Sequence, residues 1–149
     1  MSSGLRELRV WQEAVSLGGD VIRAIRPAMR RETKVISESV MMTGMLVGSH
    51  IADGFARPSP AEQRECYLAA KRALLRLETE LAIARHAELV AAGVFTELCA
   101  RSAQVSRLLT GYLVYLDRQI SEREASPIAP ALGQGPPGDA NRDSVRVPS

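Results

Sequence analysis

The sequence contains few aromatic residues and few of the residues that form metal sites. Phe, Trp and Tyr make up 4% of its 149 residues, so the aromatic runs that strands favour are scarce. Cys66 and Cys99 stand far apart, with no CxxC motif or Cys/His cluster, which argues against a zinc site or a disulfide framework. We therefore expect an all-α protein whose cysteines are reduced, as in the cytoplasm, and which holds no metal or cofactor.

Signals for secretion or for the membrane are also missing. Residues 1–11 lack a basic region followed by an apolar one, as a signal peptide would have. Before the Pro/Gly-rich C-terminal residues, the longest stretch without a charged residue is Ser39 to Ala52, which has 14 residues and includes serine, threonine and glycine. This is too short and too polar for a membrane span, so we expect no membrane partner.

What is plentiful is arginine. Of the 19 basic residues only Lys34 and Lys71 are lysines, yet the net charge is just +2. Bulk charge therefore does not indicate nucleic-acid binding. Arginine does suit bidentate phosphate contacts, although a bias in coding composition explains its abundance equally well.

Apolar residues recur every three or four positions in four segments, which predicts four helices. The segments are Leu5 to about Ala28, Val35 to Ala56, Pro60 to about Ala87, and about Phe95 to Glu124. Their short connections predict an antiparallel up-down-up-down four-helix bundle over residues 1–125. Residues 126–149 hold five prolines and three glycines without apolar periodicity, which predicts a disordered tail.

The joint between the second and third helices has a clear local chemistry. Ser59, Pro60 and Glu62 have the spacing of a capping box, with serine as N-cap and proline at the first helical position. Gly54 and Pro58 close the preceding helix. The two helices should therefore be antiparallel neighbours.

The second helix has too many apolar positions for one bundle interior to bury. Gly44 and Gly48 lie four apart, a spacing that allows close helix approach. We expect an oligomer interface here, formed by Met41, Met45, Gly44, Gly48, His50 and Asp53. His50 and Asp53 either satisfy polar groups at the helix end or across a subunit contact, with Arg57 as partner of Asp53, or form a proton-sharing or metal-binding pair.

Two stretches resemble a known family. They are LRVWQEAVSL (residues 8–17) and SHIADGFARPSPAEQRECYLAAKRALLRLETEL (residues 49–81). They are similar to motifs of the four-helix bundle proteins encoded by intervening sequences in bacterial 23S ribosomal RNA genes. The first stretch resembles the family's Leu-x-Val-Trp-x-x-Ala opening. The second resembles its Asn-Ile-Ala-Glu-Gly-x-x-Arg helix end and the Ser-x-x-Glu start that follows. His50 and Asp53 stand where that family has Asn and Glu. The likeness covers about residues 5–116.

A related branch comprises the accessory variability determinants of diversity-generating retroelements. These are homopentamers that bind a reverse transcriptase and its template RNA. The resemblance therefore implies a homo-oligomer, with a pentamer as the expected state, and a partnership with RNA or DNA and with a reverse transcriptase.

No P-loop, GxGxxG, HExxH or GxSxG motif occurs in the sequence, so we expect no catalytic residues. Two basic groups are the candidates for binding nucleic acid: Arg23, Arg26, Arg30, Arg31 and Lys34 near the first turn, and Arg57, Arg64, Lys71, Arg72 and Arg76 along the third helix. The alternatives are a solvated surface and a protein interaction module that binds no nucleic acid.

Overall fold

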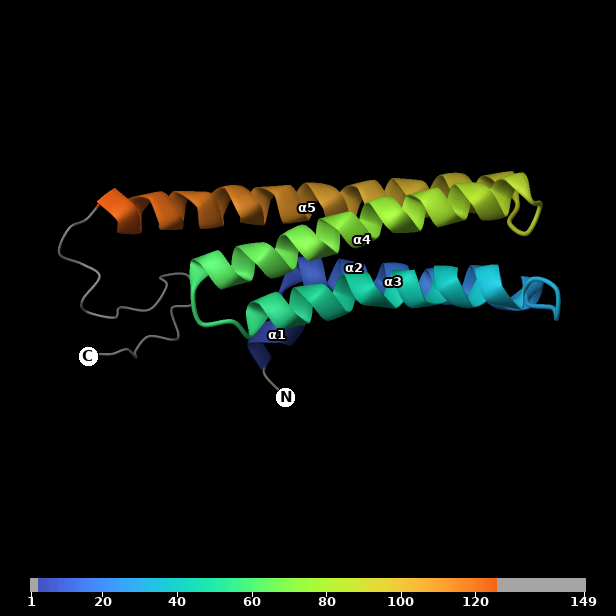
Figure 1. The fold of residues 1–149 in the computed structure, drawn as a ribbon, viewed down its shortest axis with the longest axis horizontal. Coiled ribbons are helices and arrows are strands. Elements are labelled where there is room, and N and C mark those ends of the chain that lie inside the picture. The colour runs from blue at the N-terminus through green and yellow to red at the C-terminus, as the bar shows by residue number, and fades with distance from the viewer. Residues whose placement is uncertain (1–2, 126–149) are drawn as a thin grey trace.

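The computed structural model describes residues 3–125, and every regular element in that range is a helix (Figure 1). A short helix, α1 (Ser3–Glu7), precedes α2 (Arg9–Ile25), the 3-10 turn η1 (Arg26–Ala28), α3 (Lys34–Phe55), α4 (Pro60–His86) and α5 (Ala92–Ala125). The predicted all-α class is confirmed. The tail predicted for residues 126–149 lies outside the described residues.

The four long helices lie alongside one another (Figure 1). α3 packs against both α2 and α4, and α5 packs against both α4 and α2. The colours of Figure 1 show that successive long helices run in opposite directions. Consequently the α2–α3 and α4–α5 connections lie at one end of the molecule and the α3–α4 connection lies at the other.

The core runs along the axis that the long helices share. Tyr67 and Leu77 of α4 are fully buried, as are Leu17 of α2 and Leu109 of α5. These are positions of the apolar periodicity, and burying one such side chain stabilises the fold by roughly 1.5–3 kcal/mol. The sequence pattern therefore identifies the inward faces of the helices.

The first helix is shorter than its periodicity predicts. Leu8 has φ −78° and ψ 114°, an extended conformation that separates α1 from α2. The Gln12 side chain donates to the carbonyl oxygen of Arg6 at 2.6 Å, which satisfies one backbone acceptor at the break. At the other end α2 stops at Ile25, because Pro27 cannot continue an α-helix and instead lies in η1.

The joint between α3 and α4 follows the predicted chemistry with one difference. Ser59 is the N-cap of α4, and its Oγ accepts the Glu62 backbone N–H at 3.3 Å. The Glu62 carboxylate accepts from the Ser59 hydroxyl at 3.1 Å, where a full capping box would have it accept from the N-cap backbone N–H. The cap therefore fixes the start of α4 through the serine side chain.

Gly54 explains how the joint packs. A Cβ at this position would lie 2.9 Å from Cζ and Cε1 of Tyr67 and 3.1 Å from Cβ of Cys66. Carbon atoms in favourable contact are about 3.5–4.0 Å apart. Only glycine therefore lets the buried Tyr67 ring lie against the last turn of α3.

α3 is the most apolar helix. By length and composition it could cross a membrane, a property that the core helices of many water-soluble proteins share. Here α3 lies between α2 and α4, and Val40, Val47 and Ile51 are completely buried by them. This packing accounts for part of its apolar composition, whereas Met42 and Met45 of the same helix are 56% and 51% exposed.

Candidate functional site

The basic residues between positions 23 and 34 gather at one end of the molecule, where α2 passes into α3. Arg26 belongs to η1, Arg30 and Arg31 follow it, and all three are exposed. The Thr33 hydroxyl accepts the Arg30 backbone N–H at 2.8 Å and donates to the Ala28 carbonyl at 2.8 Å. This turn is therefore held in one conformation, with its arginines facing solvent.

The charges of this cluster are only partly compensated. Arg23 pairs with Asp20 at 2.5 Å, and Lys34 lies 3.8 Å from Glu38. The Arg30 guanidinium donates to the carbonyls of Pro27 and Met29. Among residues 3–125, Arg26, Arg30 and Arg31 form no ion pair with a carboxylate. We call Arg23, Arg26, Arg30, Arg31 and Lys34 the basic end.

The second predicted group is divided among different surfaces. The Arg64 guanidinium pairs with Asp117 of α5 at 2.6 Å, and Lys71 Nζ donates to the Thr110 hydroxyl of α5 at 2.6 Å. Arg76 pairs with Glu80 at 3.1 Å on the side that faces α3. Three of the five residues thus already bind groups of this chain.

Arg57 and Arg72 are the remaining members of that group, and both are exposed. Arg57 lies in the α3–α4 connection, at the end of the molecule opposite the basic end (Figure 1). Arg72 lies midway along α4. The structure therefore does not bring Arg57, Arg64, Lys71, Arg72 and Arg76 together as one basic face.

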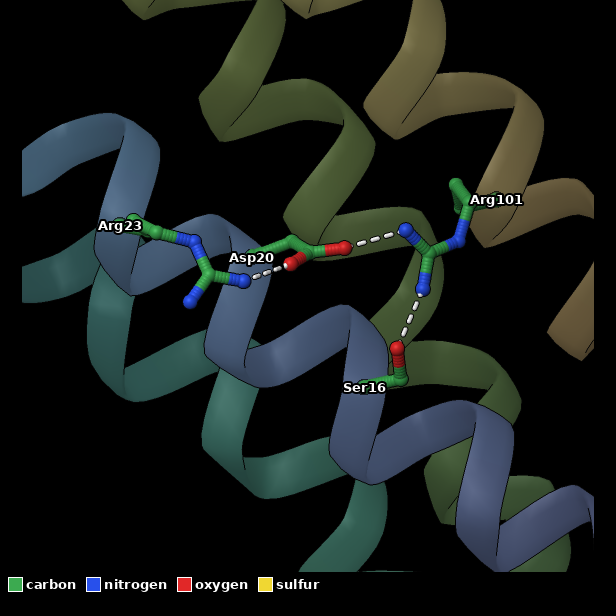
Figure 2. A network of polar contacts seen from close by, with 4 residues as sticks. All are labelled: Ser16, Asp20, Arg23 and Arg101. Carbon is green, nitrogen blue, oxygen red and sulfur yellow. Dashed lines mark hydrogen bonds and ion pairs between the residues drawn. The ribbon is translucent and has the colours of Figure 1, made fainter.

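A charged network joins α2 to α5 (Figure 2). Asp20 of α2 accepts hydrogen bonds from Arg23 of α2 and from Arg101 of α5, and Arg101 also donates to the Ser16 hydroxyl at 2.7 Å. Burial by itself raises the pKa of Asp20, but the hydrogen bonds from Arg101 and Arg23 outweigh it and hold that pKa below its ordinary value of 3.8. Asp20 and Arg101 lie 81 positions apart in the sequence, so no sequence spacing could have predicted that they form a pair.

A second network joins α3 to α4. Glu80 accepts the Ser39 hydroxyl at 2.7 Å and Arg76 Nε at 3.1 Å. Burial acts to raise the pKa of Glu80, whereas the hydrogen bonds from Ser39 and Arg76 lower it, and the net direction is down. Glu80 is therefore ionised at neutral pH and ties the two helices together.

Within the described helix α3, the predicted pair His50 and Asp53 forms no hydrogen bond or ion pair with each other. His50 is half-buried and Asp53 is exposed, and within residues 3–125 neither forms a hydrogen bond or ion pair with Arg57. The expected compensation of Asp53 by Arg57 is therefore not made within the chain. No group of three His, Cys, Asp or Glu side chains in the described part could hold a metal ion.

The two cysteines are free and half-buried. Burial, and after it the charge of Glu78, raises the pKa of the Cys99 thiol. A raised pKa keeps the sulfur protonated and weakly nucleophilic. Cys99 therefore has none of the activation that a catalytic cysteine requires.

An apolar groove of about 310 Å³ runs between α2 and α3. Its floor is narrow because the two helices approach closely: a Cβ on Gly18 would lie 3.1 Å from the carbonyl oxygen of Gly44. Val15 and Met45 at its rim are 49% and 51% exposed. The lining consists of Trp11, Ala14, Val15, Gly18, Gly19, Ile22, Gly44, Met45, Gly48, Ser49 and Ala52.

The residues predicted for an oligomer interface do not share one environment: some are buried within the chain and others line the groove. Gly44 is buried against Val21 of α2 in the same chain. Met45 and Gly48 line the groove, and Met41 packs partly against the core. Met42, which was not among the predicted interface residues, is 56% exposed. Burial of α3 by its own chain accounts for some of these residues and leaves Met42 and Met45 in solvent.

Taken together, the described residues define an all-helical protein with apolar and basic surfaces and with no assembled catalytic constellation. The chain belongs to the family of 23S rRNA-intervening sequence proteins, whose family model matches residues 6–111. This confirms the resemblance to that family. The further link to accessory proteins of retroelements stays a prediction.

A solved structure shows the same fold. It is a protein of unknown function from the S23 ribosomal protein family of Bacteroides thetaiotaomicron, which is 14% identical to this chain with a TM-score of 0.65. The alignment covers 70% of this chain and 97% of that chain. No functionally curated protein matches this one.

Proposed function

We propose that this protein is a non-enzymatic, homo-oligomeric bundle of the up-down-up-down type that presents its basic end to the phosphates of RNA or DNA. The observation that carries the proposal is the basic end itself. Arg26, Arg30 and Arg31 are exposed on a turn that Thr33 holds in place, and none of them forms an ion pair with a carboxylate of residues 3–125. Arginines arranged in this way suit bidentate phosphate contacts.

Self-association is supported by the groove between α2 and α3. Val15 and Met45 line it and are about half exposed, and a monomer gains nothing from leaving such apolar side chains in water. A second copy that covers this face would bury them. The resemblance makes a pentamer the expected oligomeric state. We propose that the protein is cytoplasmic.

Assembly would also strengthen phosphate binding. Each copy contributes one basic end, so several weak contacts act together on one nucleic acid. The reverse transcriptase that the resemblance implies would be a further partner of the assembled form. Both ideas stay predictions that depend on the oligomer.

The experiment is RNA binding by the purified full chain at several salt concentrations. We expect affinity for a structured RNA to fall steeply as salt rises, because phosphate contacts release counterions. The variant Arg26→Glu/Arg31→Glu should lose most of this binding. The matched control is Arg107→Glu/Arg118→Glu, which reverses two exposed arginines of α5 that lie away from the basic end and should bind much more tightly than the first variant.

Light scattering on the same samples separates assembly from binding. If RNA affinity is insensitive to salt, or if the two charge variants bind equally well, the basic end is not the binding surface. A monomer at all concentrations would refute self-association.

The alternative function is a protein interaction module that binds no nucleic acid. The observation in its favour is that Arg64, Lys71 and Arg76 are already engaged with Asp117, Thr110 and Glu80. Protein purified without nuclease that carries no nucleic acid and does not bind RNA at low salt would favour this function.

A further inference from the structure

One side of α4 carries exposed aliphatic residues beside arginines. Leu75 is 67% exposed and Ile83 is 51% exposed, Arg72 is exposed, and the Arg76 side chain is 57% exposed. Residues three or four positions apart share one side of a helix. We call Leu68, Arg72, Leu75, Arg76, Thr79 and Ile83 the α4 face.

Contacts on either side of the α4 face show that it points away from the rest of the chain. Arg64 and Lys71 reach to α5, and Glu80 reaches to Ser39 of α3. Tyr67, Leu74 and Leu81 turn into the core. The α4 face lies between these directions, so α3 and α5 flank it and neither covers it.

The α4 face differs chemically from the basic end. Exposed aliphatic side chains contribute little to folding, whereas on a binding surface they supply the area that a partner removes from water. Leu75 lies between Arg72 and Arg76. Among residues 3–125 Arg72 has no ion pair, and the carboxylate bound by Arg76 is that of the largely buried Glu80. The face is thus apolar with an uncompensated positive charge.

We infer that the α4 face docks an amphipathic helix of a protein partner, with acidic residues flanking the partner's apolar stripe. The apolar stripe of the partner helix would cover Leu75 and Ile83, and the acidic residues beside that stripe would pair with Arg72 and with the outer side of Arg76. From Leu68 to Ile83 the face is about 22 Å long, at about 1.5 Å per residue. This length accommodates about four turns of a partner helix laid along it.

A protein fits this face better than a nucleic acid does. Phosphate backbones are bound through closely spaced charged and polar groups, while here Leu75 and Ile83 occupy the exposed positions near the arginines. Glu65, one turn before Leu68, is also exposed and would repel any anion, so the partner's acidic residues would lie beside Arg72 and Arg76 and not beside Glu65. The inference uses residues outside the basic end and does not depend on RNA binding.

The test uses two synthetic amphipathic peptides of equal length and equal apolar stripe, one with glutamate flanks and one with lysine flanks. Fluorescence anisotropy with the full chain should show saturable binding of the glutamate peptide and much weaker binding of the lysine peptide. Leu75→Gln/Ile83→Gln should weaken the glutamate peptide at least tenfold, and so should Arg72→Glu. Because these side chains are exposed, the variants should fold normally.

The matched control is Val94→Gln, an exposed aliphatic position on α5 (38%) that lies beside α2. It should leave peptide affinity unchanged. Equal binding of both peptides, absence of binding, or equal affinity in all variants would overturn the inference.

Two further readouts on the same variants identify other uses of this face. If Leu75→Gln/Ile83→Gln dissociates the oligomer, the face is a contact between copies and the inference is wrong. If Arg72→Glu lowers RNA affinity but leaves peptide affinity intact, the face serves nucleic acid and the inference is again wrong. Loss of RNA binding in Arg26→Glu/Arg31→Glu bears only on the proposed function.

Discussion

Replacing Gly54 with alanine tests how the α3–α4 joint is packed. The new Cβ would lie 2.9 Å from two carbon atoms of the fully buried Tyr67 ring and 3.1 Å from Cβ of Cys66. These atoms cannot retreat easily, because the ring is packed in the core. Overpacking of this kind costs about 1–3 kcal/mol, and the better helix propensity of alanine returns at most about 1 kcal/mol.

Gly111 on α5 provides the matched control. A Cβ there has no heavy atom within 4 Å, so Gly111→Ala should stabilise the protein by about 0.5–1 kcal/mol through helix propensity alone. We therefore expect Gly54→Ala to have a free energy of unfolding about 1–3 kcal/mol below that of Gly111→Ala. Most of this difference reports the steric conflict with Tyr67.

The assay is urea unfolding followed by circular dichroism at several protein concentrations, so that any contribution from assembly is visible. The double variant Gly54→Ala/Tyr67→Leu should lose less stability than the sum of its two single changes, because removing the ring relieves the conflict. If Gly54→Ala is as stable as Gly111→Ala, glycine is not required by packing at this joint.

Three further predictions concern charge and assembly. Asp20→Asn should reduce the free energy of unfolding at neutral pH by about 1 kcal/mol. The folded-state pKa of Asp20 lies below 3.8, so this contribution should be lost as the pH falls through that folded-state value. The thermal unfolding curves of wild type and variant should therefore converge in acid. Val15→Gln/Met45→Gln should shift the oligomer toward smaller species in light scattering, whereas Val94→Gln should not; equal masses would refute the role of the groove. Arg26→Glu/Arg31→Glu should abolish the salt-dependent part of RNA binding in a filter-binding assay, and an unchanged salt slope would contradict the proposed function.

Local chemistry was enough to predict most of the helices. Ser59 and Pro60 mark the start of α4 and Pro27 the end of α2, because capping and proline geometry act over a few residues. The break at Leu8 was missed, since an apolar residue in an extended conformation leaves no pattern in the sequence. The apolar spacing of three or four residues in this segment matches the inner face of α4, where Leu74, Leu77 and Leu81 are buried.

The candidate surfaces were less predictable. Arg64, Lys71 and Arg76 were candidates because they lie along one helix, but the sequence could not show that Asp117 and Thr110 of α5 and Glu80 of α4 bind their side chains. The basic end was easier to predict, because its residues are close together in the sequence. His50 and Asp53 share a helical turn, yet spacing alone could not show whether they interact.

The sequence by itself determined the helical class, the main helix boundaries and the family, because periodicity, caps and short motifs depend on residues close together in the chain. Only the tertiary structure decided which charges remain free, which glycines are needed and which apolar residues stay exposed. Asp20 meets Arg101, and Gly54 meets Tyr67. Such contacts depend on how the helices pack against one another, and no local pattern encodes that arrangement.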